Sequence, residues 1–110
     1  MHVTRIGDAK PYEAKLHHAM TALQLQGGAE SETTRFTLGL SHFLPGGGAE
    51  HAASATEKIY LVISGHVTVI TEKGEVTLGP LDSCHLAPNE GRSIENRANA
   101  PATMAVIVSK

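Results

Sequence analysis

The stretch FLPGGGAEHAASATEKIYLVISGHVTV, residues 43–69, is the part of the sequence from which a fold can be read most directly. Pro45 and the three glycines that follow it are typical of a turn, and they predict that a preceding strand stops there. Glu50 and His51 are then expected in a short alanine-rich loop. This loop is a natural place for polar side chains to reach a pocket.

The second half of the stretch predicts two strands. Lys58–Ser64 is β-branched and aromatic, and it is too short for a typical helix. Gly65 ends this segment, and residues 66–71 are expected to return as the partner strand of a hairpin.

Both faces of the strand Lys58–Ser64 are apolar. Tyr60 and Val62 share one face, and Ile59, Leu61 and Ile63 share the other. A strand that is apolar on both faces is usually buried on both. In a small barrel the outer face is covered by N-terminal residues or by another subunit, so we predict a homodimer.

The segment before this stretch, Arg35–Leu44, alternates clearly enough to predict a strand. One face of it is more apolar than the other and consists of Phe36, Leu38, Leu40, His42 and Leu44. Because the apolar face is expected to point into the core, this pattern predicts that His42 points inward.

The remaining segments indicate an all-β protein. Strands are expected at residues 16–25, 76–78, 83–87, 92–96 and 102–108, with turn signals about every eight to twelve residues and no convincing amphipathic helix. The 110 residues fit one domain, with N-terminal strands or an arm over residues 1–30 and a barrel over residues 31–110.

Composition excludes several classes of function. The formal net charge is −2 and no basic stripe is present, so no nucleic-acid partner is predicted. No run of about 18 apolar residues occurs, so no membrane span is expected. A lone cysteine, Cys84, forms no intrachain disulfide, and the N-terminus has no apolar run typical of a signal peptide; both favour a cytoplasmic location.

Residues 35–108 resemble the cupin superfamily. The resemblance is carried by PGG with His51, by EKIYLVISGHVTV, and about fifteen residues later by LDSCHLAPNEGRSIEN. It implies a double-stranded β-helix, that is, a small jelly-roll barrel. In that family three histidines and one glutamate from these motifs usually hold a divalent metal.

The ligand set that the resemblance implies is not intact. When the motifs are aligned on Gly65 and Asn96, the glutamate position holds Lys58, one histidine position holds Arg92, and only His51 keeps its expected type. Both replacements are cationic at neutral pH. At about 4 Å and an effective dielectric of 20, each cation would cost a bound dication roughly 4–8 kcal/mol, so no metal or other cofactor is predicted. One alternative remains: a rearranged site made of His51, His42 and either His17 or His18.

The same replacements predict an anion-binding pocket. Arg92 can grip a carboxylate or phosphate, and a partly buried Lys58 beside it would lose proton affinity and become a base or nucleophile. We therefore assign catalytic roles to His51, Lys58 and Tyr60, with His51 as the acid or base near pH 7. Substrate-binding roles are assigned to Arg92, His42 and Asn96.

Three functions follow from this prediction. The first is a metal-independent enzyme that performs acid/base chemistry, of isomerase, lyase or hydrolase type, on a small anionic or carbonyl-containing molecule. The second is a cupin that binds or senses a ligand without chemistry. The third is a metal-dependent, oxygenase-type cupin that uses the rearranged histidine set. The sequence does not name the substrate.

Overall fold

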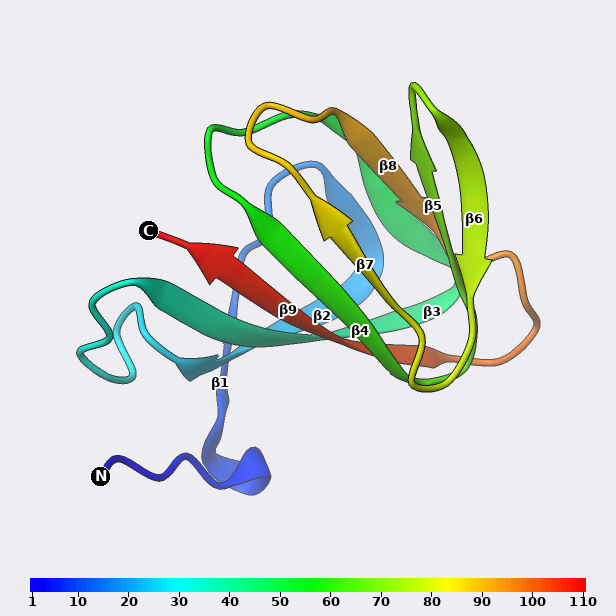
Figure 1. The fold of residues 1–110 in the computed structure, drawn as a ribbon. Helices are drawn as coiled ribbons and strands as arrows, with labels where there is room; N and C mark the ends of the chain where they lie inside the picture. Colours follow the sequence, from blue (N-terminus) through cyan, green and yellow to red (C-terminus); the bar gives the residue numbers. More distant parts are fainter.

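The computed structural model describes residues 1–110 and is built from antiparallel β-strands, with one short 3-10 helix and no α-helix (Figure 1). The elements are η1 (Ile6–Asp8), β1 (Lys10–Tyr12), β2 (His17–Gln26), β3 (Phe36–Ala52), β4 (Lys58–Ser64), β5 (Val67–Thr71), β6 (Gly74–Leu78), β7 (Ser83–Leu86), β8 (Arg92–Glu95) and β9 (Ala102–Ser109). The strands predicted at residues 16–25, 58–64, 76–78, 83–87, 92–96 and 102–108 are thereby confirmed to within a few residues.

The strands close into a barrel of the predicted jelly-roll type. Their order is β6-β5-β8-β3-β9-β4-β7, and β2 pairs along the free side of β3. The barrel has two walls: one is made of β7, β4, β9 and the first half of β3, and the other of the second half of β3 with β8, β5 and β6. The first half of β3 pairs with β9, from Phe36 opposite Ser109 to Phe43 opposite Ala102. The second half of β3 pairs with β8, where Ala49 lies opposite Ile94. The all-β fold predicted from turn spacing is confirmed.

The prediction that the Pro45–Gly48 segment stops a strand is wrong, because β3 continues through it to Ala52. These glycines do not reverse the chain; they allow the backbone of β3 to lie close to the backbones of β2 and β8. A Cβ on Gly47 would lie 2.2 Å from the Ala19 carbonyl oxygen, and one on Gly48 would lie 1.9 Å from that of Ile94. Only a residue without a side chain fits between β2 and β8 at this point, so residues 50–52 are strand residues and not a loop.

The hairpin predicted between residues 58–64 and 66–71 is also wrong. Strand β4 pairs with β7 and β9, whereas β5 pairs with β6 and β8, so the chain crosses from one wall to the other between them. Gly65 makes this crossing with φ +75, and a Cβ there would lie 2.6 Å from the Pro101 carbonyl oxygen. The chain therefore turns at Gly65 as predicted, but the turn leads to the opposite wall and not to a paired strand.

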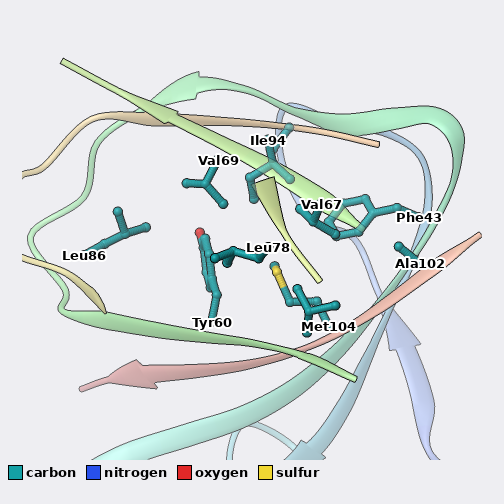
Figure 2. Packing of buried hydrophobic residues seen from close by; sticks show 11 residues of the cluster. Phe43, Tyr60, Val67, Val69, Leu78, Leu86, Ile94, Ala102 and Met104 are labelled. Atoms are coloured by element: carbon teal, nitrogen blue, oxygen red, sulfur yellow. The ribbon is translucent and has the colours of Figure 1, made fainter. Parts of the chain in front are cut away.

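The core lies between the two walls (Figure 2). Its fully buried large side chains include Phe43, Tyr60, Val62, Ile94 and Met104. Tyr60 and Val62 alternate along β4 and both point inward, as the sequence predicts.

The inward face of β3 is the reverse of the predicted one. Ser41 and Phe43 are buried, whereas Phe36 and Leu44 are more than half exposed. His42 therefore points away from the interior, where its Nδ1 lies 3.0 Å from the Thr103 hydroxyl. Apolar alternation misled the prediction because the outer surface of this wall is itself apolar.

The N-terminal residues divide into two parts. Strand β2 pairs with β3 and is part of the barrel wall, whereas η1 and the residues before it project away from the barrel (Figure 1). No helix in the structure has the length and apolar character needed to cross a membrane.

Candidate functional site

A cavity of about 250 Å³ lies inside the barrel, and the strands β2, β3, β4, β8 and β9 all contribute to its lining. Its apolar floor is made by Phe43, Ile94, Met104, Val106 and Val108. Its polar residues are Tyr12, Glu13, Lys15, His17, Ser41, Lys58, Tyr60 and Arg92. An apolar hollow with a few convergent polar groups is the usual form of a small-molecule site.

Arg92 is the most buried cation of the protein, with 9% of its surface exposed. Its Nε donates a hydrogen bond to the Tyr60 hydroxyl at 2.8 Å, and one terminal nitrogen donates to the Glu50 carbonyl at 3.3 Å. No carboxylate pairs with it. The structure therefore holds a guanidinium in the cavity wall with its charge uncompensated by an ion pair.

Lys58 enters the same cavity from β4. Its Nζ donates a 2.5 Å hydrogen bond to the Ser54 hydroxyl, and it too has no carboxylate partner. Burial, and secondly the nearby Arg92 charge, lower the pKa of Lys58. Two cations without counter-ions thus face one cavity.

Tyr60 lies two residues beyond Lys58 on the same face of β4 and is 2% exposed. Figure 2 shows its ring rising from the strand into the space between the walls. Burial raises the pKa of Tyr60, while the charge of Arg92 and its hydrogen bond act in the opposite direction. The phenol therefore stays protonated at neutral pH and orients the guanidinium.

The N-terminal segment supplies polar groups that the sequence did not assign to the site. Tyr12, Glu13 and Lys15 reach the cavity from β1 and the connection to β2. Burial raises the pKa of Tyr12, and its hydroxyl lies 3.4 Å from where a Cβ on Gly39 would stand. No local pattern marks these residues, because the pairing of β1 with β2 is what brings them to the barrel.

His17 also lines the cavity, although the sequence offered it only as an alternative metal ligand. Its Nδ1 lies 2.7 Å from the Lys15 carbonyl oxygen. Burial lowers the pKa of His17; the hydrogen bond to Lys15 opposes this, and the charges of Arg92 and His18 add to it. His17 is thus a neutral imidazole in the cavity wall at neutral pH.

Three other predicted site residues, His51, His42 and Asn96, do not line this cavity. His51 is exposed, and its ring lies against Gly91, where a Cβ would come within 2.7 Å of Nε2. His42 faces outward, as described above. The barrel interior is thus not where either imidazole is found.

Asn96 is buried, and its side-chain amide forms hydrogen bonds with backbone groups. Its Nδ2 donates to the carbonyls of Phe43 and Ala100, and its Oδ1 accepts from the Ala98 amide. This side chain fixes the turn after β8, and the backbone partners account for its burial.

The residues present do not fit the metal that the cupin motifs imply. Two of the ligand positions carry Lys58 and Arg92, and no group of three or more His, Cys, Asp and Glu side chains is arranged to hold an ion. The rearranged set is not assembled either, since His17 lines the cavity, His42 faces outward and His51 packs on Gly91.

Cys84 lies in β7 and packs against the core from a partly buried position. Burial raises the pKa of the Cys84 thiol, which opposes formation of the nucleophilic thiolate. The neighbouring His85 points the other way and pairs with Glu57 at 2.5 Å.

Comparison with known proteins agrees with this architecture. Over 109 residues the chain is 42% identical to the β-D-galactosidase Rv1717 of Mycobacterium tuberculosis, covering 99% of this chain and 94% of that protein. The polyketide cyclase RemF of Streptomyces resistomycificus superposes with a TM-score of 0.87 at 16% identity, over 99% of this chain and 79% of that one.

A sugar phosphate isomerase from a cupin superfamily, from Silicibacter pomeroyi, superposes with a TM-score of 0.72 at 21% identity, over 93% of this chain and 68% of that one. The chain belongs to the same family as the mycobacterial protein, and its fold is the jelly-roll barrel of these cupin structures. No family profile matches the sequence. The solved structures share less than a quarter of its residues, so they show its fold alone.

Proposed function

We propose that this cupin is an enzyme that cleaves a β-galactoside carrying an anionic group, by metal-independent acid/base chemistry in the barrel cavity. The observation that carries the proposal is the pair of cations, Lys58 and Arg92, that face one cavity without a carboxylate partner. The mycobacterial relative named a β-D-galactosidase supports the sugar class, since it is 42% identical over nearly the whole of both chains.

The size of the cavity suits a small substrate. A volume of about 250 Å³ lies just below the roughly 300–1,000 Å³ of sites for drug-sized ligands. The proposal requires the cavity to hold one sugar ring, which is smaller than a drug-sized ligand. The apolar floor offers one face to the ring carbons, and the polar residues offer hydrogen bonds to hydroxyl groups.

The charge of the cavity is the reason for proposing an anionic sugar. Its lining holds three full cations, Lys15, Lys58 and Arg92, against one carboxylate, Glu13. Glycoside hydrolysis passes through a transition state with oxocarbenium character, which gains positive charge. A cation about 4 Å away costs such a state about 4 kcal/mol at an effective dielectric of 20. A carboxylate on the substrate offsets that cost.

Four cavity residues have assigned roles in this proposal. Arg92, held by Tyr60, binds the substrate carboxylate, and Lys58 adds a second charge-assisted hydrogen bond. The protonated ammonium of Lys58, with its lowered pKa, is a suitable proton donor to the leaving oxygen. Glu13 is the carboxylate that can face the developing positive charge.

The test compares two chromogenic substrates, the 4-nitrophenyl β-D-galactoside and the corresponding β-D-galacturonide, with the α-D-galactoside as a control. We expect turnover of the galacturonide with the higher kcat/KM, unchanged after dialysis against a chelator. Loss of activity on chelation would contradict the metal-independent proposal. Saturable binding of galacturonate with no turnover of any glycoside would instead favour the ligand-binding alternative.

We also propose that the protein acts as a homodimer through the outward face of β4 and β9. Ile59, Ile63 and Ile107 are 38–44% exposed there, and Ile59, Ile107 and Leu38 lie side by side across three strands. Exposed apolar side chains that adjoin one another mark contact surfaces more often than isolated ones do. The size of the particle in solution, measured by sedimentation, tests this proposal; a monomer at micromolar concentration would refute it.

A further inference from the structure

His17 occupies a short segment with unusual backbone geometry. Leu16 has φ 59 and Ala19 has φ 48, so left-handed residues other than glycine stand on both sides of His17 and His18. Each such residue costs about 1–3 kcal/mol and persists only where surrounding contacts hold it. Here the Glu50 amide donates to the Leu16 carbonyl at 2.8 Å, and the Ala19 carbonyl fits against Gly47.

The two histidines between these left-handed residues line different hollows. His17 lines the barrel cavity, whereas His18 lines a separate hollow of about 460 Å³ beside Glu50 and Asn96. Only one of the two imidazoles therefore meets a ligand held by Lys58 and Arg92.

The hydrogen bond of His17 defines its tautomer. A carbonyl oxygen only accepts, so the contact of Nδ1 with the Lys15 carbonyl at 2.7 Å requires the hydrogen to be on Nδ1. In the neutral ring Nε2 then carries a lone pair. This is the arrangement in which a backbone acceptor orients a catalytic histidine.

We infer that His17 is the proton acceptor of the cavity, presenting an unprotonated Nε2 to the substrate, a role that the sequence had suggested for His51. The inference rests on the proposed glycoside cleavage for its substrate. In that reaction Nε2 takes one proton from a water molecule while the water oxygen bonds to the anomeric carbon. The glycosidic C–O bond breaks, its electron pair stays on the leaving oxygen, and Lys58 protonates that oxygen. Solvent then returns the proton from His17 to Lys58.

The groups around His17 are consistent with this role. Arg92 from β8 and Lys58 from β4 are cationic, Lys15 is cationic on its own segment, and Glu13 is the one carboxylate in the lining. Burial lowers the pKa of His17, and the charges of Arg92 and His18 lower it further against the opposing hydrogen bond to the Lys15 carbonyl. The ring is thus neutral and available as a base near pH 7.

The matched variants are His17→Gln and His18→Gln. With the galacturonide as substrate, we expect His17→Gln to lower kcat about 100- to 10,000-fold, the usual contribution of a general base, with KM changed by less than about threefold. His18→Gln should stay within about twofold of the unchanged protein. A His17→Gln variant that keeps its kcat within twofold would overturn the inference, as would equal losses in both variants.

A second measurement does not depend on turnover. Nitrogen-15 NMR of the whole protein reports the tautomer of each histidine, and free D-galacturonate is the probe. We expect the Nδ1–H tautomer at His17, and resonances of its ring that move on addition of galacturonate while those of His18 do not. An Nε2–H tautomer, or no response of His17 to a bound probe, would overturn the inference.

The two measurements separate the inference from the proposed function. If the wild-type protein turns over no glycoside, the proposed function fails, and the tautomer together with the galacturonate response still decides the status of His17. If glycosides are cleaved and His17→Gln is fully active, the proposed function stands and the inference alone fails.

Discussion

The seven residues of β4 alternate between two faces of the strand, and the side chains on these faces differ in polarity and burial. The inward face carries Lys58, Tyr60 and Val62, and it changes from polar to apolar as the strand runs into the core. The outward face carries Ile59 and Ile63, which stay 42% and 44% exposed. Lys58 and Tyr60 thus line the cavity, while two isoleucines of the same strand remain partly exposed on the outside. This distribution is the reason for proposing a ligand contact on the inward face and a second copy of the chain on the outward face.

The largest effect on this comparison is expected from Arg92→Met. The substitution keeps much of the side-chain length but removes a buried charge and leaves the Tyr60 hydroxyl without its donor. We expect affinity for D-galacturonate to fall about 100-fold or more, measured by calorimetry. The exposed Arg97, paired with Glu75 and Glu95, gives a matched control in Arg97→Met, which should leave affinity unchanged. Equal affinities in the two variants would remove Arg92 from the binding site.

A smaller loss is expected from Lys58→Met, because Lys58 is less buried than Arg92 and its charge is better solvated. The predicted change is a roughly 10-fold weaker binding of galacturonate, with binding of neutral D-galactose unaffected. The ratio of the two affinities is the informative quantity. If the affinities for both sugars fall equally, Lys58 contributes to binding through packing and not through its charge.

On the outer face, Ile59→Glu places a charge among apolar side chains of β4 and β9. If that face is buried in a dimer, the unpaired carboxylate should weaken association at least about 10-fold, measured by sedimentation equilibrium. Val76→Glu is the control, since Val76 is 50% exposed on β6, away from this surface. A variant that dimerises as tightly as the unchanged protein would show that the interface lies elsewhere.

The smallest effect is expected from pH. The pKa of Lys58 is lowered by burial and by the charge of Arg92. As the pH rises, Lys58 therefore loses its positive charge at a lower pH than an ordinary lysine, whose pKa is about 10.4. Since the charged form binds the anion, affinity for galacturonate should fall severalfold as the pH rises through that pKa. The fall should be absent in Lys58→Met. A profile that stays flat up to pH 10 in the unchanged protein would contradict this role.

Much of the fold followed from local pattern. Strand β4 was predicted to the residue, because seven β-branched and aromatic residues between turn signals leave few alternatives. The placement of Lys58 and Tyr60 on one face follows from the two-residue period of a strand, and Arg92 reaches the same cavity.

The predictions that were wrong or missing concern how distant strands pair, which no local sequence pattern specifies. Glycines that usually end a strand here allow β3 to pass between two others, and His42 lies on an apolar face that turned out to be the outside. The N-terminal residues Glu13 and His17 reach the site only because β1 and β2 pair with each other and with β3. Such placements depend on which strands meet, and sequence period alone does not determine that.

The membership of β3 in both walls has a consequence for synthesis of the protein. Residues 36–43 pair with 102–109, so β3 waits during translation for a strand that is made considerably later. Until β9 leaves the ribosome, the edge of β3 and the apolar residues beneath it have no intramolecular cover, a state prone to wrong pairing. We therefore expect the yield of folded protein to depend on how soon β9 becomes available to pair with β3.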